Sequence, residues 1–132
     1  MTNLTILYAT DDLTSRLHQT HAARGWEVFH PNSINEALAM SIYYTPHAVV
    51  IDGDSDWLNE LVVNLTSVTG PSARLKDIVV RLAEEPLDLD VPEYILFHEL
   101  PAATTPEALA HALEVLHLQR EQDARSQPFL VA

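Results

Sequence analysis

Three aspartates stand at positions from which they could do chemistry together. Asp11 and Asp12 are adjacent and follow the apolar run Leu4–Ala9, and Asp52 closes the apolar run Ala48–Asp52. Converging carboxylates repel one another unless a hard cation with oxygen ligands, most often Mg²⁺, lies between them. Such a cation would also neutralise a phosphoryl group under attack by a carboxylate. We therefore take all three as candidate Mg²⁺ ligands and Asp52 as the candidate nucleophile.

Five short apolar runs predict the strands that would position these acids. Each run is rich in Ile, Val, Leu or aromatic residues, as expected of strands covered on both faces in a parallel sheet. They are Leu4–Ala9, Trp26–His30, Ala48–Asp52, Asp77–Ala83 and Tyr94–His98. In a doubly wound α/β sheet of order 2-1-3-4-5, the three aspartates meet at the carboxyl edge beside the strand-order reversal, where ligands bind.

Apolar residues at helical spacing predict four helices between and after the strands. The second begins at Ser33, whose side chain and that of Glu36 can satisfy each other's free backbone amides in a capping box. Its predicted buried stripe is Ile34, Leu38 and Ile42. The other helices are predicted over Leu13–Arg24, over Ser55–Thr69, and from a cap at Thr105 through Gln122.

The connection between the fourth and fifth strands is too short for a covering helix. Residues 84–92 include Pro86 and Pro92, which interrupt any helix there. We therefore expect the fourth crossover helix to be missing. Because no repeat, linker or low-complexity segment marks a second domain, we predict one domain over residues 1–124 and a C-terminal tail over 125–132.

The composition of the chain argues against several classes of partner and of functional site. The 132 residues include 7 Lys+Arg and 19 Asp+Glu, a formal net charge of −12, so nucleic acid would meet a repulsive field. The chain has no Cys, which excludes disulfides, thiolate metal sites and Cys nucleophiles. Its apolar runs are too short to cross a bilayer and its first residues lack a signal-peptide pattern, so we expect a cytoplasmic protein without membrane contact.

Three motifs between residues 25 and 52 carry a family resemblance. They are Gly25-Trp26-Glu27-Val28, Glu36-Ala37-Leu38 and Pro46-His47-Ala48-Val49-Val50-Ile51-Asp52. They resemble, with the same spacing and no gaps, the Gly-aromatic-Glu-Val, Glu-Ala-Leu and Pro-Asp-Leu-Val-Leu-Leu-Asp of the receiver domain of bacterial two-component response regulators. The resemblance covers residues 4–118. It implies the flavodoxin-like receiver fold, an acidic pair at Asp11 and Asp12, and a phosphoacceptor at Asp52.

The chain departs from the family at two site positions. The family has Thr or Ser at the end of the fourth strand, but Arg81-Leu82-Ala83-Glu84 offers neither. It also has a Lys near the end of the fifth strand, where two alignments place Phe97 or Leu100, and the one lysine of this chain is Lys76. The losses remove two charge-assisted contacts to a phosphoryl group, each worth about 1.5–3 kcal/mol.

The resemblance and these losses together favour a stand-alone, degenerate receiver, a pseudo-receiver that is not an enzyme. It would act in signalling as a protein-interaction or dimerisation module. One alternative is a working Mg²⁺-dependent phosphoacceptor that takes a phosphoryl group on Asp52 from a histidine kinase. Another, from a different class, is a small flavodoxin-like cofactor or nucleotide binder. Asp11 and Asp12 disfavour that class because they would repel a phosphate.

For several residues near the predicted site, the sequence allows more than one interpretation. Asp52 could instead cap the loop at Gly53 or pair with Arg81. Arg81 either reaches toward the acidic cluster or points into solvent from the strand end. His98 could replace the missing lysine as a pH-sensitive donor, against the commoner reading of an isolated surface histidine. Three aromatic residues are expected to serve in packing: Tyr43, Tyr44 and Trp57.

Overall fold

The computed structural model describes residues 4–11, 25–66, 78–87, 89, 91 and 95–125. Within them, five parallel strands form one sheet of order β2-β1-β3-β4-β5. The strands are β1 (Thr5–Thr10), β2 (Glu27–Phe29), β3 (Ala48–Asp52), β4 (Ile78–Leu82) and β5 (Leu96–Leu100). The helices are α2 (Ile34–Tyr44), α3 (Asp56–Thr66) and α4 (Pro106–Arg125). The predicted fold class and strand order are confirmed.

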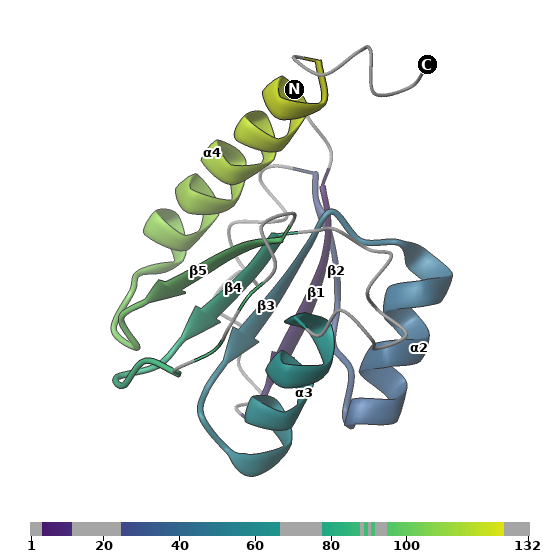
Figure 1. Ribbon diagram of the computed structural model, residues 1–132, viewed down its shortest axis with the longest axis vertical. Helices are drawn as coiled ribbons and strands as arrows, with labels where there is room; N and C mark the ends of the chain where they lie inside the picture. The colour runs from purple at the N-terminus through teal and green to yellow at the C-terminus, as the bar shows by residue number, and fades with distance from the viewer. Residues whose placement is uncertain are drawn as a thin grey trace.

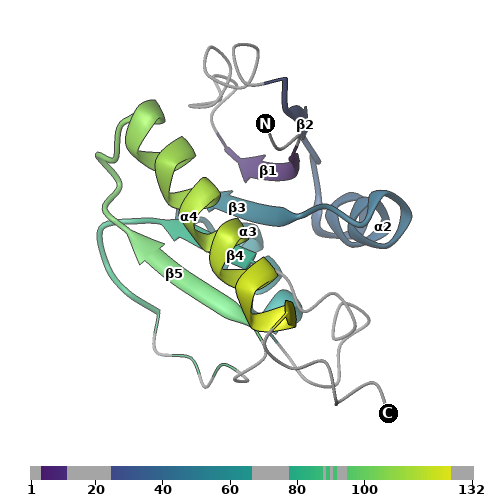
Figure 2. The same ribbon diagram turned by 90° about the horizontal axis from the view of Figure 1, so that it is seen from above.

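Helices lie over both faces of the sheet, as Figures 1 and 2 show. On one face, Leu109 and Leu113 of α4 pack with Val50 and Val80. On the other face, α2 and α3 pack against the alternate strand residues, such as Val49. We call these the α4 side and the α3 side. Each strand therefore contributes side chains to two separate cores, because successive residues point to opposite faces.

Three predicted features of the chain fall outside or at the limit of the described residues. The first predicted helix, Leu13–Arg24, and the predicted ligand Asp12 are not among them. Helix α4 includes Arg125, the first residue of the predicted tail. None of the helices that the structure describes is both long and apolar enough to span a membrane.

One of the two hydrogen bonds predicted for the N-terminal cap of α2 is confirmed. Ser33 Oγ accepts a hydrogen bond from the backbone N–H of Glu36 at 3.1 Å. The Glu36 carboxylate reaches one residue further back than a capping box requires, because it accepts from the backbone N–H of Asn32 at 3.1 Å. The two side chains still satisfy two backbone donors at the start of the helix.

The buried face of α2 differs from the predicted stripe. Ala37 and Ser41 are the buried residues of the helix, and Ile34 and Leu38 are only partly buried. Ile42 is 57% exposed, so its prediction as a core residue was wrong. The reason is that the small side chains at positions 37 and 41, four residues apart on one face, turn toward the sheet.

The aromatic residues at the end of α2 lie at the surface. Tyr43 is 76% exposed and does not pack in the core, and its ring contacts that of Tyr44 edge-on, with centroids 4.9 Å apart. Tyr44 is 42% exposed and stacks on Phe29 of β2, with ring centroids 4.2 Å apart. Trp57 of α3 is partly buried against the core of the α3 side. The predicted packing function therefore holds for Trp57 and, in part, for Tyr44.

No helix is present among the described residues where a crossover helix was predicted to be missing. The described part of this β4–β5 connection is residues 84–87, 89 and 91. Leu87, Leu89 and Val91 instead pack against the core of the α3 side. These apolar side chains occupy alternate positions, the spacing of an extended chain. They cover part of that face without a helix.

Arg81 of β4 is buried in an ion pair. The residue is 2% exposed, and its Nη1 donates to Glu99 Oε2 at 2.9 Å and to the Glu85 carbonyl at 2.7 Å. Its Nη2 donates to Asn59 Oδ1 of α3 at 3.3 Å. Both predicted positions of Arg81, near the aspartates or in solvent, were therefore wrong. Strand alternation puts Arg81 on the α3 side, whereas Asp52 has the α4-side parity of its neighbour Leu82.

The first prediction concerns this ion pair. Glu99→Gln should lower the free energy of unfolding by about 2 kcal/mol, because it leaves a buried guanidinium without its carboxylate. The figure is below the range for fully buried pairs because the Glu99 side chain is 29% exposed. Urea denaturation measures the change. Glu27→Gln at an exposed site should change stability by less than about 0.5 kcal/mol, and an equal loss in both variants would contradict a special contribution from the pair.

His47 joins β1 to α4 at the amino end of the sheet. The Thr5 N–H donates to His47 Nδ1 at 2.9 Å, and the His47 N–H donates to the Thr5 carbonyl at 2.8 Å. The His47 ring lies edge-on to His117, whose Nε2 is 2.7 Å from Glu121 Oε1. Burial, and then the neighbouring His117, lower the pKa of His47, while Glu121 opposes the shift. The accepting Nδ1 requires this ring to be neutral.

The second prediction follows from the lowered pKa of His47. Unfolded His47 takes up a proton near its ordinary pKa of 6.5, whereas the folded chain resists protonation to lower pH. The contribution to stability is therefore complete above pH 6.5 and is lost as the pH falls below it. In urea titrations, His47→Gln should show a smaller fall than the wild type. The control His111→Gln, at an exposed site on α4, should follow the wild type, and equal slopes in all three would exclude His47 as the source.

Candidate functional site

The carboxyl ends of four strands meet in one row across the sheet. Thr10 pairs with Asp52, Asp52 with Leu82, and Leu82 with Leu100. We call these four residues the carboxyl row. Asp11 follows Thr10 directly. The structure therefore brings Asp11 and Asp52 to the same edge of the sheet, which is where the strand order predicts them.

A buried tyrosine holds the Asp52 carboxylate. The Tyr8 hydroxyl donates to Asp52 Oδ2 at 2.5 Å. Tyr8 is fully buried in the core of the α4 side, two residues before the carboxyl row on β1. A phenol is a neutral donor, so it stabilises the carboxylate without supplying a positive charge. Sequence reasoning gave Tyr8 no function, and its only signal was a hydroxyl in the middle of an otherwise apolar run.

Asp11 is held from α3. Trp57 Nε1, in the first turn of that helix, donates to Asp11 Oδ1 at 2.6 Å. The turn between β3 and α3 permits this approach at Gly53, which has φ +138°, and a Cβ there would lie 2.9 Å from Leu58 Cδ1. The Gly53 N–H donates to the Leu82 carbonyl at 3.0 Å. A cap by Asp52 is therefore not needed for that amide.

Asp52 also lines a pocket at the carboxyl edge. The pocket has a volume of about 280 Å³, and its lining residues are Asp52, Gly53, Asp54, Leu82, Ala83, Glu84 and Ala102. Its charged side chains are all acidic. The walls contributed by the end of β4 and by the segment after β5 are apolar. Within the described part of the chain, this pocket presents neither a hydroxyl nor a cation to Asp52.

Two of the three predicted metal ligands, Asp11 and Asp52, are among the described residues. Among the residues that the structure describes, no group of three or more His, Asp or Glu side chains could hold a metal ion. Carboxylate oxygens at Asp11 and Asp52 are of the kind that Mg²⁺ prefers. Each carboxylate already accepts from a neutral donor at one oxygen. Because Asp12 lies outside the described residues, the three-carboxylate site stays a prediction.

The two candidate substitutes for a lysine do not reach the carboxyl row. Arg81 is bound to Glu99 on the α3 side. His98 is exposed and pairs with Val80, two residues before the row. Of the two alignment positions on β5, Leu100 lies in the row and Phe97 lies three residues before it.

Solved structures of other proteins share this architecture. The CheY-like receiver domain protein of Methanospirillum hungatei JF-1 matches with a TM-score of 0.70 and 15% identity, over 92% of this chain and 99% of that one. NtrX from Brucella abortus, solved with ADP, matches with a TM-score of 0.71 and 14% identity over 97% of this chain. The match covers only 29% of the NtrX chain.

A pseudo-receiver also has this architecture. The pseudo-receiver domain of CikA matches with a TM-score of 0.63 and 17% identity, over 86% of this chain and 96% of that domain. No family model and no curated protein matches the sequence. On the strength of its strand order and these structural likenesses, the chain has the fold of response-regulator receiver domains, with no helix among the described residues between β4 and β5.

Proposed function

We propose that this chain is a degenerate receiver, a single domain over residues 1–124, that acts in signalling as a protein-interaction or dimerisation module. The observation that carries the proposal is the composition of the carboxyl row. Across the sheet from Asp52 lie Leu82 and Leu100, and Ala83 follows Leu82. A phosphoryl group on Asp52 would therefore face apolar side chains where the family has a hydroxyl and an ammonium group.

The electrostatics of the pocket support the same proposal. Asp54 and Glu84 line the pocket with Asp52, and both are exposed acids. A phosphoryl group there would add negative charge beside them, which is unfavourable without a cation. The two absent contacts forgo about 1.5–3 kcal/mol each. Without a hydroxyl or a cation to follow the phosphoryl group, β4 and β5 have no side chain that would convert modification into a conformational change.

The hydrogen bond from Tyr8 also opposes chemistry at Asp52. Its hydroxyl donates to Oδ2 of that carboxylate. A hydrogen bond to a charged group contributes about 1.5–3 kcal/mol, so this bond stabilises the carboxylate and makes Oδ2 a weaker nucleophile. Tyr8 thus favours Asp52 as a structural acceptor.

The second candidate function is phosphoacceptance with Mg²⁺ from a histidine kinase. It is favoured by one observation, the presence of Asp11 and Asp52 at the same edge beside an open pocket. In that case Asp11, Asp12 and Asp52 would hold the ion, and Mg²⁺ would neutralise charge on the transferring oxygens. Asp52 would be the nucleophile.

The third prediction separates these two functions. With acetyl phosphate and Mg²⁺, the intact mass of the wild-type chain should stay unchanged under conditions that modify ordinary receivers. Ala83→Thr/Leu100→Lys should acquire the mass of one phosphoryl group, because it restores the missing hydroxyl and ammonium. The adduct should disappear when Asp52→Asn is added. A stable adduct on the wild type that Asp52→Asn abolishes would replace the proposed function with the second one.

The fourth prediction concerns the bond between Tyr8 and Asp52. Tyr8→Phe should lower the free energy of unfolding by about 1–2 kcal/mol, because a part-buried carboxylate loses a donor. In a double-mutant cycle with Asp52→Asn, the coupling energy should be about 1 kcal/mol, measured by urea denaturation. Additive effects would mean that the bond contributes nothing to stability. Mg²⁺ should leave the wild type unchanged, whereas stabilisation by Mg²⁺ would show binding to the folded state.

A further inference from the structure

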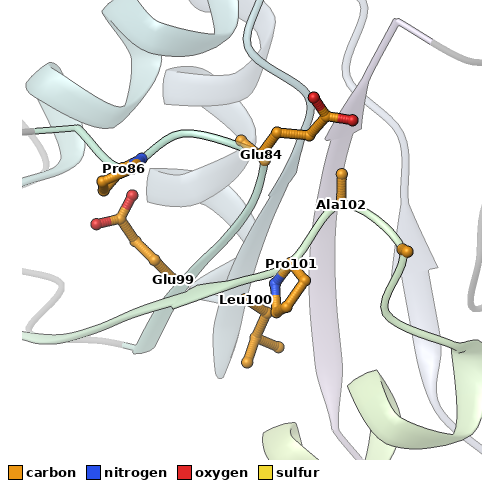
Figure 3. Close-up of a pocket in the computed structure, with 8 residues that line it drawn as sticks. Glu84, Pro86, Glu99, Leu100, Pro101 and Ala102 are labelled. Atoms are coloured by element: carbon orange, nitrogen blue, oxygen red, sulfur yellow. The ribbon is translucent and has the colours of Figure 1, made fainter.

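An open groove lies beside the carboxyl ends of β4 and β5 (Figure 3). Its volume is about 470 Å³, and its walls come from the start of the β4–β5 connection and from residues 99–103. Six of its eight lining residues are Ala, Pro or Leu. The lining of the groove is therefore mainly apolar. It adjoins the pocket at Asp52, with which it shares Ala83, Glu84 and Ala102.

Backbone hydrogen bonds fix both walls of the groove. The Ala83 N–H donates to the Leu100 carbonyl at 3.2 Å, which ties the end of β4 to the end of β5. After β5, the N–H and the hydroxyl of Thr104 both donate to the Pro101 carbonyl, at 3.0 Å and 2.6 Å. The groove therefore exists before any ligand arrives, which lowers the conformational cost of binding.

The charge at this edge is acidic. Glu99 is engaged with Arg81 and with the backbone N–H of Leu87, at 2.9 Å and 3.0 Å. Glu84 points away from Glu99 in Figure 3, and it lines both the groove and the adjoining pocket, to which Asp54 also belongs. Among the residues that the structure describes, no Lys or Arg lines the groove or the pocket. A ligand with a positive charge at the Glu84 end would balance the negative charge of this edge.

We propose that the groove binds an extended, basic segment of a partner protein. Apolar side chains of the segment would lie on the Ala- and Pro-lined floor, and a Lys or Arg would lie between Glu84 and Asp54. Charge complementarity selects this occupant, because the acidic residues at this edge, in a chain with a formal net charge of −12, attract a basic segment more strongly than a second copy of the chain or an acidic or phosphate-bearing ligand. The inference rests on the proposed interaction function and names the chemistry of the partner.

The fifth prediction tests the groove with an end-blocked peptide of alternating Arg and Ala. The full chain is titrated without Mg²⁺ or phosphodonor, and backbone amide shifts are followed by NMR. Shifts should concentrate at residues 83–86 and 99–103. Glu84→Gln/Asp54→Asn should weaken the Kd about tenfold, the scale of two rim ion pairs. Ala103→Trp, which fills the groove without changing charge, should weaken binding at least as much.

The matched control removes the same charge elsewhere. Glu27→Gln/Glu60→Gln alters exposed acids on β2 and α3, and it should leave the Kd within about twofold of the wild type. If both double variants weakened the Kd equally, or if Ala103→Trp bound the peptide as tightly as the wild type, the peptide would bind through general surface charge and not in the groove. Either result would overturn the proposal. A peptide of alternating Glu and Ala should not bind. Phosphorylation of the wild type would contradict only the proposed function, because this titration contains no phosphodonor.

Discussion

The alternation of side chains between the two faces of the sheet decides which charged groups can meet. Asp52 and Tyr8 have the same parity and meet at the end of β3. Arg81, one residue before Leu82 in the carboxyl row, has the opposite parity and meets Glu99 instead. Strand β4 thus places the Arg81 side chain within one residue of the acidic edge but on the opposite face of the sheet. Two acids at that edge accept hydrogen bonds from neutral donors of the described chain, Asp52 from the phenol of Tyr8 and Asp11 from the indole of Trp57.

The pair of Arg81 and Glu99 also ties the β4–β5 connection to the sheet, and no helix occurs in the described residues of that connection. Glu99 Oε2 accepts from Arg81 Nη1 and from the backbone N–H of Leu87, so one carboxylate links β4, β5 and the connection between them. Beyond this point, apolar side chains at alternate positions cover the α3 side. The groove beside Leu100 lies at the start of this connection.

The elements of the fold could be predicted because each has a local signal. The apolar runs marked the strands, the prolines at 86 and 92 excluded a helix, and Ser33 marked the start of α2. The face of α2 could not be assigned in the same way. Its large apolar residues suggested Ile42, but small residues at 37 and 41 decide the approach to the sheet. Apolar periodicity identifies a helix more readily than it identifies the side chains that allow close packing.

For the candidate site, the sequence predicted where the acidic residues lie but not which residues they contact. Asp11 and Asp52 were expected at the sheet edge from the order of the strands, and they lie there. Their partners depend on contacts between residues 44 and 46 positions apart in the chain, for which a hydroxyl or an indole gives no local signal. The partner of Arg81 depends on the register between β4 and β5. That register follows from packing, and the sequence of either strand alone does not determine it.

The double use of the Glu99 carboxylate has a consequence for motions within the native state. One oxygen accepts from a side chain of the sheet and from a backbone amide of the connection, so a movement of Glu99 away from Arg81 would release both contacts together. Native-state hydrogen exchange at the Leu87 amide should therefore report the opening of the connection together with the exposure of the Arg81 guanidinium. The β4–β5 region would open as one cooperative unit, coupled through a single oxygen atom.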